Sequence, residues 1–101
     1  MKKFVVERIL PGAGNLTPQE LQAIAQTSCE VILQMGKPYY WIESLVTEDK
    51  IYCIHIAESE EVVREHARLG QFPINTISEA KTVIDPLISN PVPEHLLMTS
   101  V

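Results

Sequence analysis

The sequence lacks the short motifs that mark common catalytic sites. It has no G-x-S-x-G nucleophile elbow, no H-E-x-x-H zinc helix and no glycine-rich phosphate loop. Glycine occurs only four times, which leaves no obvious place for a mononucleotide loop. These absences argue against a nucleophilic hydrolase and against a nucleotide-binding protein.

Positive charge and long apolar runs are also scarce. The eight basic residues are spread from Lys2 to Lys81 without a cluster, and the net charge is −5. This balance argues against a nucleic-acid partner. No apolar run approaches the roughly 18 residues of a membrane span. Glu7 and Arg8 interrupt the apolar part of the N-terminal stretch, so we expect it to form a first strand rather than a secretory signal. We expect a cytoplasmic protein with no membrane partner.

Cysteine is rare as well, and the chain is short. Cys29 and Cys53 are the two cysteines, and two free thiols in a reducing compartment are expected. A length of 101 residues fits one domain. A domain of this size buries only about two-thirds of the surface of its unfolded chain, so oligomerisation is a natural way to gain core.

The hydrophobic pattern predicts four strands and two helices in the order β-α-β-β-α-β. The first helix has the strongest signals: Thr17 as N-cap, Pro18 at the first helical position, Glu20 completing a capping box, and Gly36 at the end. The short connections predict an α+β, ferredoxin-like βαββαβ domain over residues 1–86, with both helices on one face of an antiparallel sheet. Residues 87–101 are expected to form an irregular tail, and the predicted elements are 3–10, 18–35, 39–47, 50–57, 60–69 and 76–84.

Alternation along the strands assigns two faces to this sheet. The helix-covered face should be the more uniformly apolar one, and Arg8 falls on it despite its charge. Its apolar members are expected to be Phe4, Val6, Leu10, Tyr40, Ile42, Val46, Tyr52, Ile54 and Ile56. The opposite face is mixed and collects Val5, Glu7, Ile9, Trp41, Glu43, Ile51, Cys53 and His55.

A mixed face of this kind favours assembly. We expect a sheet-to-sheet homodimer, a dimeric α/β barrel, that buries Ile9, Ile51 and Trp41 and encloses the polar groups in a cavity. Trp41 is interpreted as an interface anchor, because aromatic residues carry much of the energy of interfaces. The occupant of the cavity would be a metal ion or a small molecule.

The stretch KIYCIHI contains the best candidate ligands. Cys53 and His55 stand two apart on one strand, so both side chains point to the same side. Thiolate and imidazole suit nickel, zinc or copper, and Glu43 and Glu7 on neighbouring strands could add carboxylate oxygens. The alternative is a buried, hydrophobe-like Cys53 with His55 hydrogen-bonded to a glutamate.

His66 is an outer candidate for the metal site. It lies at or beside the buried stripe of the second helix, which we place on the opposite side of the sheet from Cys53. One chain is therefore not expected to bring His66 and His55 to a single ion. A half-buried histidine that caps a loop carbonyl is the competing interpretation, and a separate surface metal site is another.

Several segments together resemble a known family. They are FVVERILP, LTPQELQAIA, WIESLVTEDKIYCIHIA, EEVVREHARLGQFP and TVIDP, and they cover Phe4 to about Pro86. The sequence resembles a family of small domains, long of unknown function, whose described representative is a nickel-binding protein with a ferredoxin-like fold that dimerises. The resemblance implies binding of nickel or another divalent transition metal, with sequestration or delivery as the role rather than catalysis.

A rival hypothesis comes from fold analogy. Dimeric ferredoxin-like barrels also include small cofactor-free enzymes, such as monooxygenases and lactone isomerases, with a polar cavity. Glu7 or Glu43 would then be a general base, His55 would assist it, and Trp41 would be a wall of the pocket. A third possibility is an accessory domain whose sheet face serves only to dimerise.

Overall fold

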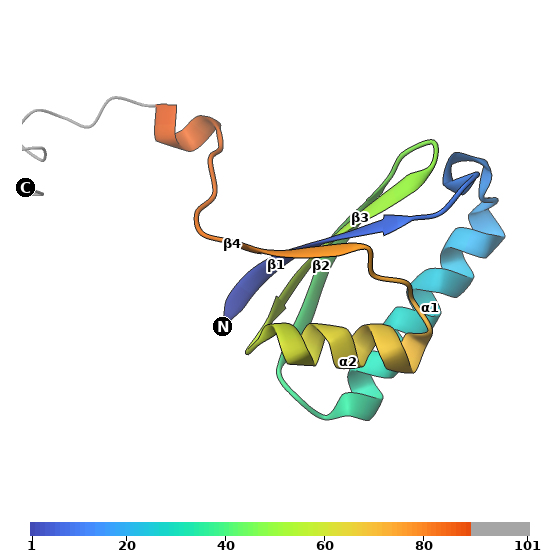
Figure 1. Ribbon diagram of the computed structural model, residues 1–101, viewed down its shortest axis with the longest axis horizontal. Helices are drawn as coiled ribbons and strands as arrows, with labels where there is room; N and C mark the ends of the chain where they lie inside the picture. The colour runs from blue at the N-terminus through green and yellow to red at the C-terminus, as the bar shows by residue number, and fades with distance from the viewer. Residues whose placement is uncertain (90–101) are drawn as a thin grey trace, which may run out of the picture.

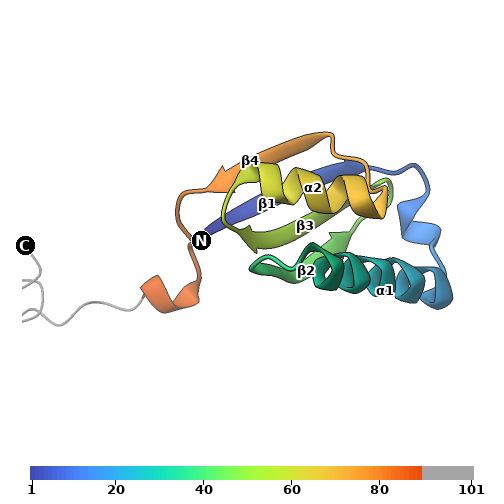
Figure 2. The same cartoon turned by 90° about the horizontal axis from the view of Figure 1, so that it is seen from below.

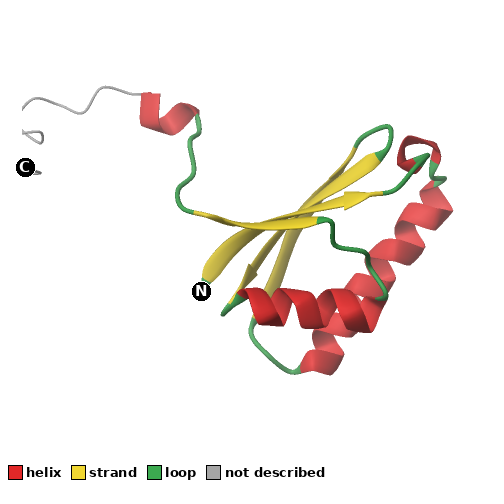
Figure 3. Ribbon diagram, in the orientation of Figure 1, coloured by secondary structure: helices red, strands yellow, loops and turns green. Residues whose placement is uncertain are grey.

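The computed structural model describes residues 1–89. The chain forms an antiparallel sheet with two helices on one face (Figures 1 and 2). The strand order is β2-β3-β1-β4. This α+β arrangement is consistent with the predicted ferredoxin-like fold. In chain order the elements are β1 (Lys2–Ile9), η1 (Ala13–Asn15), α1 (Pro18–Met35), β2 (Tyr39–Val46), β3 (Lys50–Ala57), α2 (Glu60–Gly70), β4 (Thr76–Ala80) and η2 (Pro86–Ser89), where η marks a short 3₁₀ helix (Figure 3).

Helix α1 begins and ends where the sequence predicts. The Thr17 hydroxyl accepts a hydrogen bond from the Glu20 N–H, and the Glu20 carboxylate accepts one from the Thr17 N–H, which completes the capping box. Gly36 ends the helix in the left-handed conformation, with φ of 63°. Helix α2 carries an i,i+4 ion pair, with Arg64 Nε 3.0 Å from Glu60 Oε2.

Strand β4 is shorter than predicted. It pairs only with β1, and its last pair joins Ala80 to Lys3. Because β1 begins at Lys2, residues beyond Ala80 have almost no strand left to pair with. Pro86–Ser89 form the turn η2, so the expected irregular tail contains a short helix at its start. The rest of that tail lies outside the described residues, and the domain boundary at residue 86 stays a prediction.

The assignment of faces is wrong for β3. Phe4, Val6 and Arg8 of β1 are buried beneath the helices, and β3 pairs with them so that Phe4 lies opposite His55 and Val6 opposite Cys53. Directly opposed residues of an antiparallel pair point to the same side. Ile51, Cys53 and His55 therefore face the helices, whereas Tyr52, Ile54 and Ile56 lie on the uncovered face.

A β-bulge changes the faces of β2. The register shifts between Trp41 and Glu43, so that Trp41 lies opposite His55 and Ser44 opposite Cys53. A bulge inserts an extra residue and breaks the alternation of side chains. Trp41 and Ser44 consequently share the helix-covered face with Cys53 and His55. Glu43, opposite Ile54, lies on the other side, although strict alternation predicted that it accompanies Trp41.

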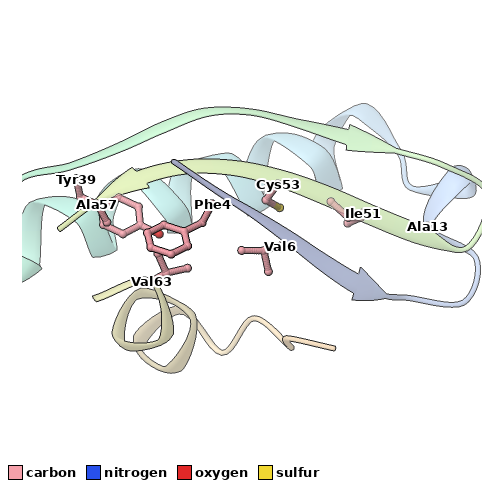
Figure 4. Packing of buried hydrophobic residues seen from close by; sticks show 8 residues of the cluster. All are labelled: Phe4, Val6, Ala13, Tyr39, Ile51, Cys53, Ala57 and Val63. Carbon is pink, nitrogen blue, oxygen red and sulfur yellow. The ribbon is translucent and has the colours of Figure 1, made fainter. Parts of the chain in front are cut away.

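The core lies between the sheet and α2. Figure 4 shows Tyr39, Phe4 and Val63 at one end of the cluster and Cys53 between them and Ile51. Phe4, Val6 and Val63 are at most 2% exposed. Neither helix within residues 1–89 has the length and apolar character that a bilayer crossing requires.

Candidate functional site

A cavity of about 330 Å³ lies on the helix-covered side of the sheet. Helix α1 contributes its apolar stripe to the wall, and the sheet forms the floor. The lining residues are Arg8, Leu10, Leu21, Ile24, Ala25, Ser28, Trp41, Ser44, Val46, Ile51, Cys53, His55, His66, Phe72 and Pro73. Leu21 and Val46 are 39% and 41% exposed, so the cavity reaches the surface. Most of its wall is apolar, and the polar groups come mainly from the strands.

The two histidines of the cavity lie close to each other. His55 on β3 and His66 on α2 are each 1% exposed, and their ring centroids are 5.2 Å apart. Helix α2 covers the same face of the sheet to which His55 points. The expectation that a single chain keeps these histidines on opposite sides of the sheet is therefore wrong. The error follows directly from the reversed face of β3.

Each ring is held through one nitrogen. His55 Nδ1 lies 2.9 Å from the Tyr39 hydroxyl, and His66 Nε2 lies 3.1 Å from the Ser28 hydroxyl. Within residues 1–89, His55 Nε2 and His66 Nδ1 have no hydrogen-bond partner. A buried polar atom without a partner costs free energy. The pair therefore carries unused binding capacity in the interior.

Both histidines are held in the neutral form. Burial lowers the pKa of His55 to about 3, and the nearby His66 and Arg8 add to this effect. Burial also lowers the pKa of His66, against a hydrogen bond at Ser28 that raises it. A neutral imidazole has one N–H and one lone pair. In the tautomers that donate to Tyr39 and Ser28, the free nitrogens of both rings carry the lone pairs.

Aromatic side chains hold the histidine pair in place. The Tyr39 ring stacks on His66 at 4.8 Å and meets the edge of His55 at 5.3 Å. The Phe72 ring also stacks on His66, with the two ring centroids 5.6 Å apart. Burial raises the pKa of the Tyr39 hydroxyl, so this group stays protonated. Its hydroxyl and ring together fix the orientation of His55 and His66.

Cys53 accepts two hydrogen bonds beside this pair. It is a buried, free thiol, and its sulfur lies 3.4 Å from Arg8 Nε and 3.0 Å from Ser44 Oγ. Ser44 in turn accepts a hydrogen bond from the Trp41 indole N–H at 3.0 Å. The bulge in β2 is what places Trp41 and Ser44 on this side. Trp41 is therefore a wall of the cavity rather than part of the uncovered face.

The two predicted carboxylate ligands lie elsewhere. Glu43 is exposed on the uncovered face of β2, and Glu7 lies on the uncovered face of β1, 3.7 Å from Lys50 Nζ. The structure therefore brings Cys53, His55 and His66 to one cavity and separates them from both glutamates. Among residues 1–89, no group of three or more His, Cys, Asp or Glu side chains is arranged to hold a metal ion.

Several residues that line the cavity or contact its histidines were missed by sequence reasoning. Arg8 gave a usable signal, because a charged residue fell on the face that was expected to be apolar. Tyr39 and Ser28 gave no signal. Tyr39 begins strand β2 and Ser28 lies in the apolar stripe of helix α1, and only the packing of these elements against α2 and β3 brings them to the histidines.

The comparisons with known proteins agree with this fold. The family model of nickel responsive protein SCO4226-like matches residues 4–80, which is most of the chain. The chain belongs to this family. The resemblance stated from sequence segments is thereby confirmed. No curated protein matches the sequence.

A solved structure is also similar to this chain. It is the crystal structure of SCO4226 from Streptomyces coelicolor A3(2), with a TM-score of 0.68 and 15% sequence identity. The match covers 81% of this chain and 99% of the other. At this identity the likeness supports the fold, and the site has to be argued from the residues of this chain.

Proposed function

We propose that this protein binds nickel, or a divalent transition metal with the same ligand preference, through His55 and His66. The observation that carries the proposal is the pair of buried imidazole nitrogens, His55 Nε2 and His66 Nδ1, without a hydrogen-bond partner among the described residues. The name of the family, nickel responsive protein, supports nickel as the metal. Imidazole nitrogen is a ligand suited to nickel, zinc and copper.

The separation of the two rings suits a shared ion. Two imidazoles that bind one ion through nitrogens about 2.1 Å from it hold their ring centroids roughly 4.5 to 5.5 Å apart. The observed centroid separation is 5.2 Å. Tyr39 and Ser28 hydrogen-bond to the other nitrogens, which is how metal-ligating histidines are commonly oriented. Because burial keeps both rings neutral, no proton has to leave them first.

Cys53 lines the same cavity as the two histidines, and we propose that it joins them as a ligand after a local rearrangement, because among residues 1–89 no three such side chains are already arranged to hold an ion. A thiol that binds a metal does so as the thiolate, so Cys53 would lose its proton on binding. The negative sulfur would retain the hydrogen bonds from Arg8 and Ser44. Its charge would also offset part of the repulsion between the cation and the Arg8 guanidinium. Glu7 and Glu43 are not ligands in this scheme, because they lie on the other face of the sheet.

The role we propose is sequestration or delivery of the metal in the cytoplasm. The enzyme hypothesis required Glu7 or Glu43 as a general base next to His55. Neither carboxylate reaches the cavity that His55 lines. The donor atoms of His55, His66 and Cys53 in this cavity instead suit the binding of a metal ion.

We also propose that two copies associate through the uncovered face of the sheet. This face carries Val5, Tyr52, Ile54 and Ile56, all partly buried, and the more exposed Ile9, Tyr40 and Leu45. Glu7, Glu43 and Lys50 also lie on this face, whereas Trp41, Cys53 and His55 of the face that was expected to dimerise lie under the helices. A surface with several exposed apolar side chains is typical of an interface in a small domain. The dimer would place the two metal cavities on its outer sides.

The metal proposal is tested with tag-free protein stripped by a chelator. Calorimetric titration with nickel, zinc and copper at neutral pH should detect binding to the unmodified protein. Affinity should fall at least tenfold in His55→Gln and in His66→Gln. Cys53→Ser should also weaken binding and should abolish the sulfur-to-nickel charge-transfer absorption.

Glu43→Gln is the matched control, since it removes a candidate ligand from the opposite face. Its metal affinity should equal that of the unmodified protein. Unchanged binding in both histidine variants, or loss of binding in Glu43→Gln, would contradict the assignment. Circular dichroism of each variant identifies any loss that results from unfolding.

A further inference from the structure

Arg8 is a buried cation without an acidic partner. Its side chain is part of a residue only 5% exposed, and among residues 1–89 no Asp or Glu forms a salt bridge with it. A guanidinium stays protonated throughout the physiological range. Burying a charge without a counter-charge is costly.

The hydrogen bonds of Arg8 leave part of its guanidinium unused. Nε donates to Cys53 Sγ at 3.4 Å, and Nη1 donates to the carbonyl oxygen of Pro73. The guanidinium also lies over the Phe72 ring, 5.2 Å from its centroid. Arginine has five N–H donors, so three of them have no acceptor in the part of the chain that is described. Arg8 lines the cavity, and these donors are available to a ligand there.

The rest of the cavity suits an apolar body. Leu21, Ile24 and Ala25 of α1 form one wall, and Trp41 and Ile51 of the sheet form another. The volume of about 330 Å³ is at the lower end of the range for small-molecule sites. A few polar groups in an apolar pocket are typical of such sites.

We propose that this cavity binds a small organic carboxylate, with its carboxylate on Arg8 and its apolar body against α1. The planar guanidinium matches a carboxylate with two parallel hydrogen bonds. The carboxylate supplies the negative charge that the described residues do not. The proposal does not depend on metal binding, since it rests on Arg8 and the apolar wall.

The test compares two ligands that share an apolar body. Chelator-treated protein is titrated with octanoate and with 1-octanol, with the fluorescence of Trp41 as the signal. Trp41 is the only tryptophan of the chain and lines the cavity. Octanoate should bind at least tenfold more tightly than octanol, as expected for a charge-assisted hydrogen bond in an apolar site. Arg8→Gln should remove this preference.

Two variants of α1 test the position of the body. Ala25→Leu fills the cavity and should weaken both ligands, whereas Ala23→Leu adds the same group at an exposed position of α1 and should change neither. Equal affinity for octanoate and octanol in the unmodified protein overturns the proposal. So does binding that Ala25→Leu does not alter, or no binding of octanoate. The ligand comparison in the unmodified protein holds even if Arg8→Gln fails to fold, and none of these outcomes bears on the nickel titration.

Discussion

His55 of β3 and His66 of α2 lie with their ring centroids 5.2 Å apart, and Tyr39 contacts both rings. The Tyr39 ring stacks on His66, while its hydroxyl is hydrogen-bonded to His55. One tyrosine thus orients both histidines of the proposed metal site.

Tyr39 should act on metal affinity through the histidines. Tyr39→Phe removes the hydroxyl beside His55 Nδ1 and keeps the ring that stacks on His66. Loss of such an outer partner typically weakens a metal site tenfold or more, so we expect about a tenfold loss of nickel affinity by calorimetry. Tyr40→Phe is the control, because Tyr40 is 59% exposed on the other face. Equal affinity in the two variants would show that Tyr39 does not position His55.

The stability of the metal-free protein should decrease as the pH falls below about 6.5. Burial lowers the pKa of His55 to about 3 and also lowers that of His66, whereas both titrate near 6.5 in the unfolded chain. The unfolded state therefore binds more protons than the native state in this window, so acid favours unfolding. Each histidine lowers the free energy of unfolding by up to about 1.4 kcal/mol per pH unit. Urea denaturation between about pH 7 and pH 5 measures this slope.

His66→Gln is the comparison for the pH series. It removes one of the two titrating groups, so the slope should be shallower than that of the unmodified protein over the same window. Carboxylates titrate at lower pH and contribute equally to both proteins there. Parallel slopes would mean that His66 is protonated to the same extent in both states, contrary to its burial.

The uncovered sheet face should mediate self-association. Ile54 lies in the middle of this face, between Val5 of β1 and Glu43 of β2. Ile54→Lys places a charge there and should weaken the dimer at least tenfold, because a charge at the centre of an apolar interface must be desolvated. Sedimentation velocity over a concentration series measures the effect. Leu33→Lys on α1 is the control, since Leu33 is 82% exposed and distant from this face.

A protein that is monomeric at all concentrations would refute the dimer proposal. The same conclusion follows if both lysine variants associate as strongly as the unmodified protein. A dimer that only Leu33→Lys disrupts would instead place the interface on α1.

Glycine should be the more stable residue at both helix ends. Gly36 after α1 and Gln71 after α2 both adopt the left-handed conformation, with φ of 63° and 58°. A side chain in this region costs roughly 1–2 kcal/mol. Gly36→Ala should therefore lower the free energy of unfolding by about 1 kcal/mol, and Gln71→Gly should raise it by a similar amount or less. Urea denaturation of the pair tests this, and equal shifts of the same sign would contradict it.

Local sequence signals were sufficient for most of the elements. Helix α1 carries its own N-cap, capping box and C-terminal glycine, so its limits follow from neighbouring residues alone. The hairpin of β2 and β3 is also local, because the turn that joins its strands is short. The end of β4 was not predictable in this way, because it depends on where β1 begins, far away in the sequence.

The candidate site was only partly predictable. Cys53 and His55 were found from their spacing, which holds whichever face of the sheet they occupy. The prediction that they lie on the uncovered face was wrong, because it assumed that the helices cover the more apolar face of the sheet. Within residues 1–89 the interior instead contains polar groups that largely satisfy one another, with Tyr39 on His55 and Ser28 on His66. When buried polar groups are hydrogen-bonded to one another, the number of apolar side chains on each face of the sheet no longer decides which face is buried.

The amino-acid sequence was enough to predict the order of elements, the first helix and the pairing of a thiol and an imidazole on one strand. These features depend on periodicity and caps, which act over a few residues. Three other features follow from packing between distant segments: His66 meets His55, Trp41 and Glu43 separate at a bulge, and Arg8 lies in a cavity without a described counter-charge. Those relationships depend on strand register and helix packing between distant segments, and a shift of one residue in register would turn every side chain of the strand to the other face.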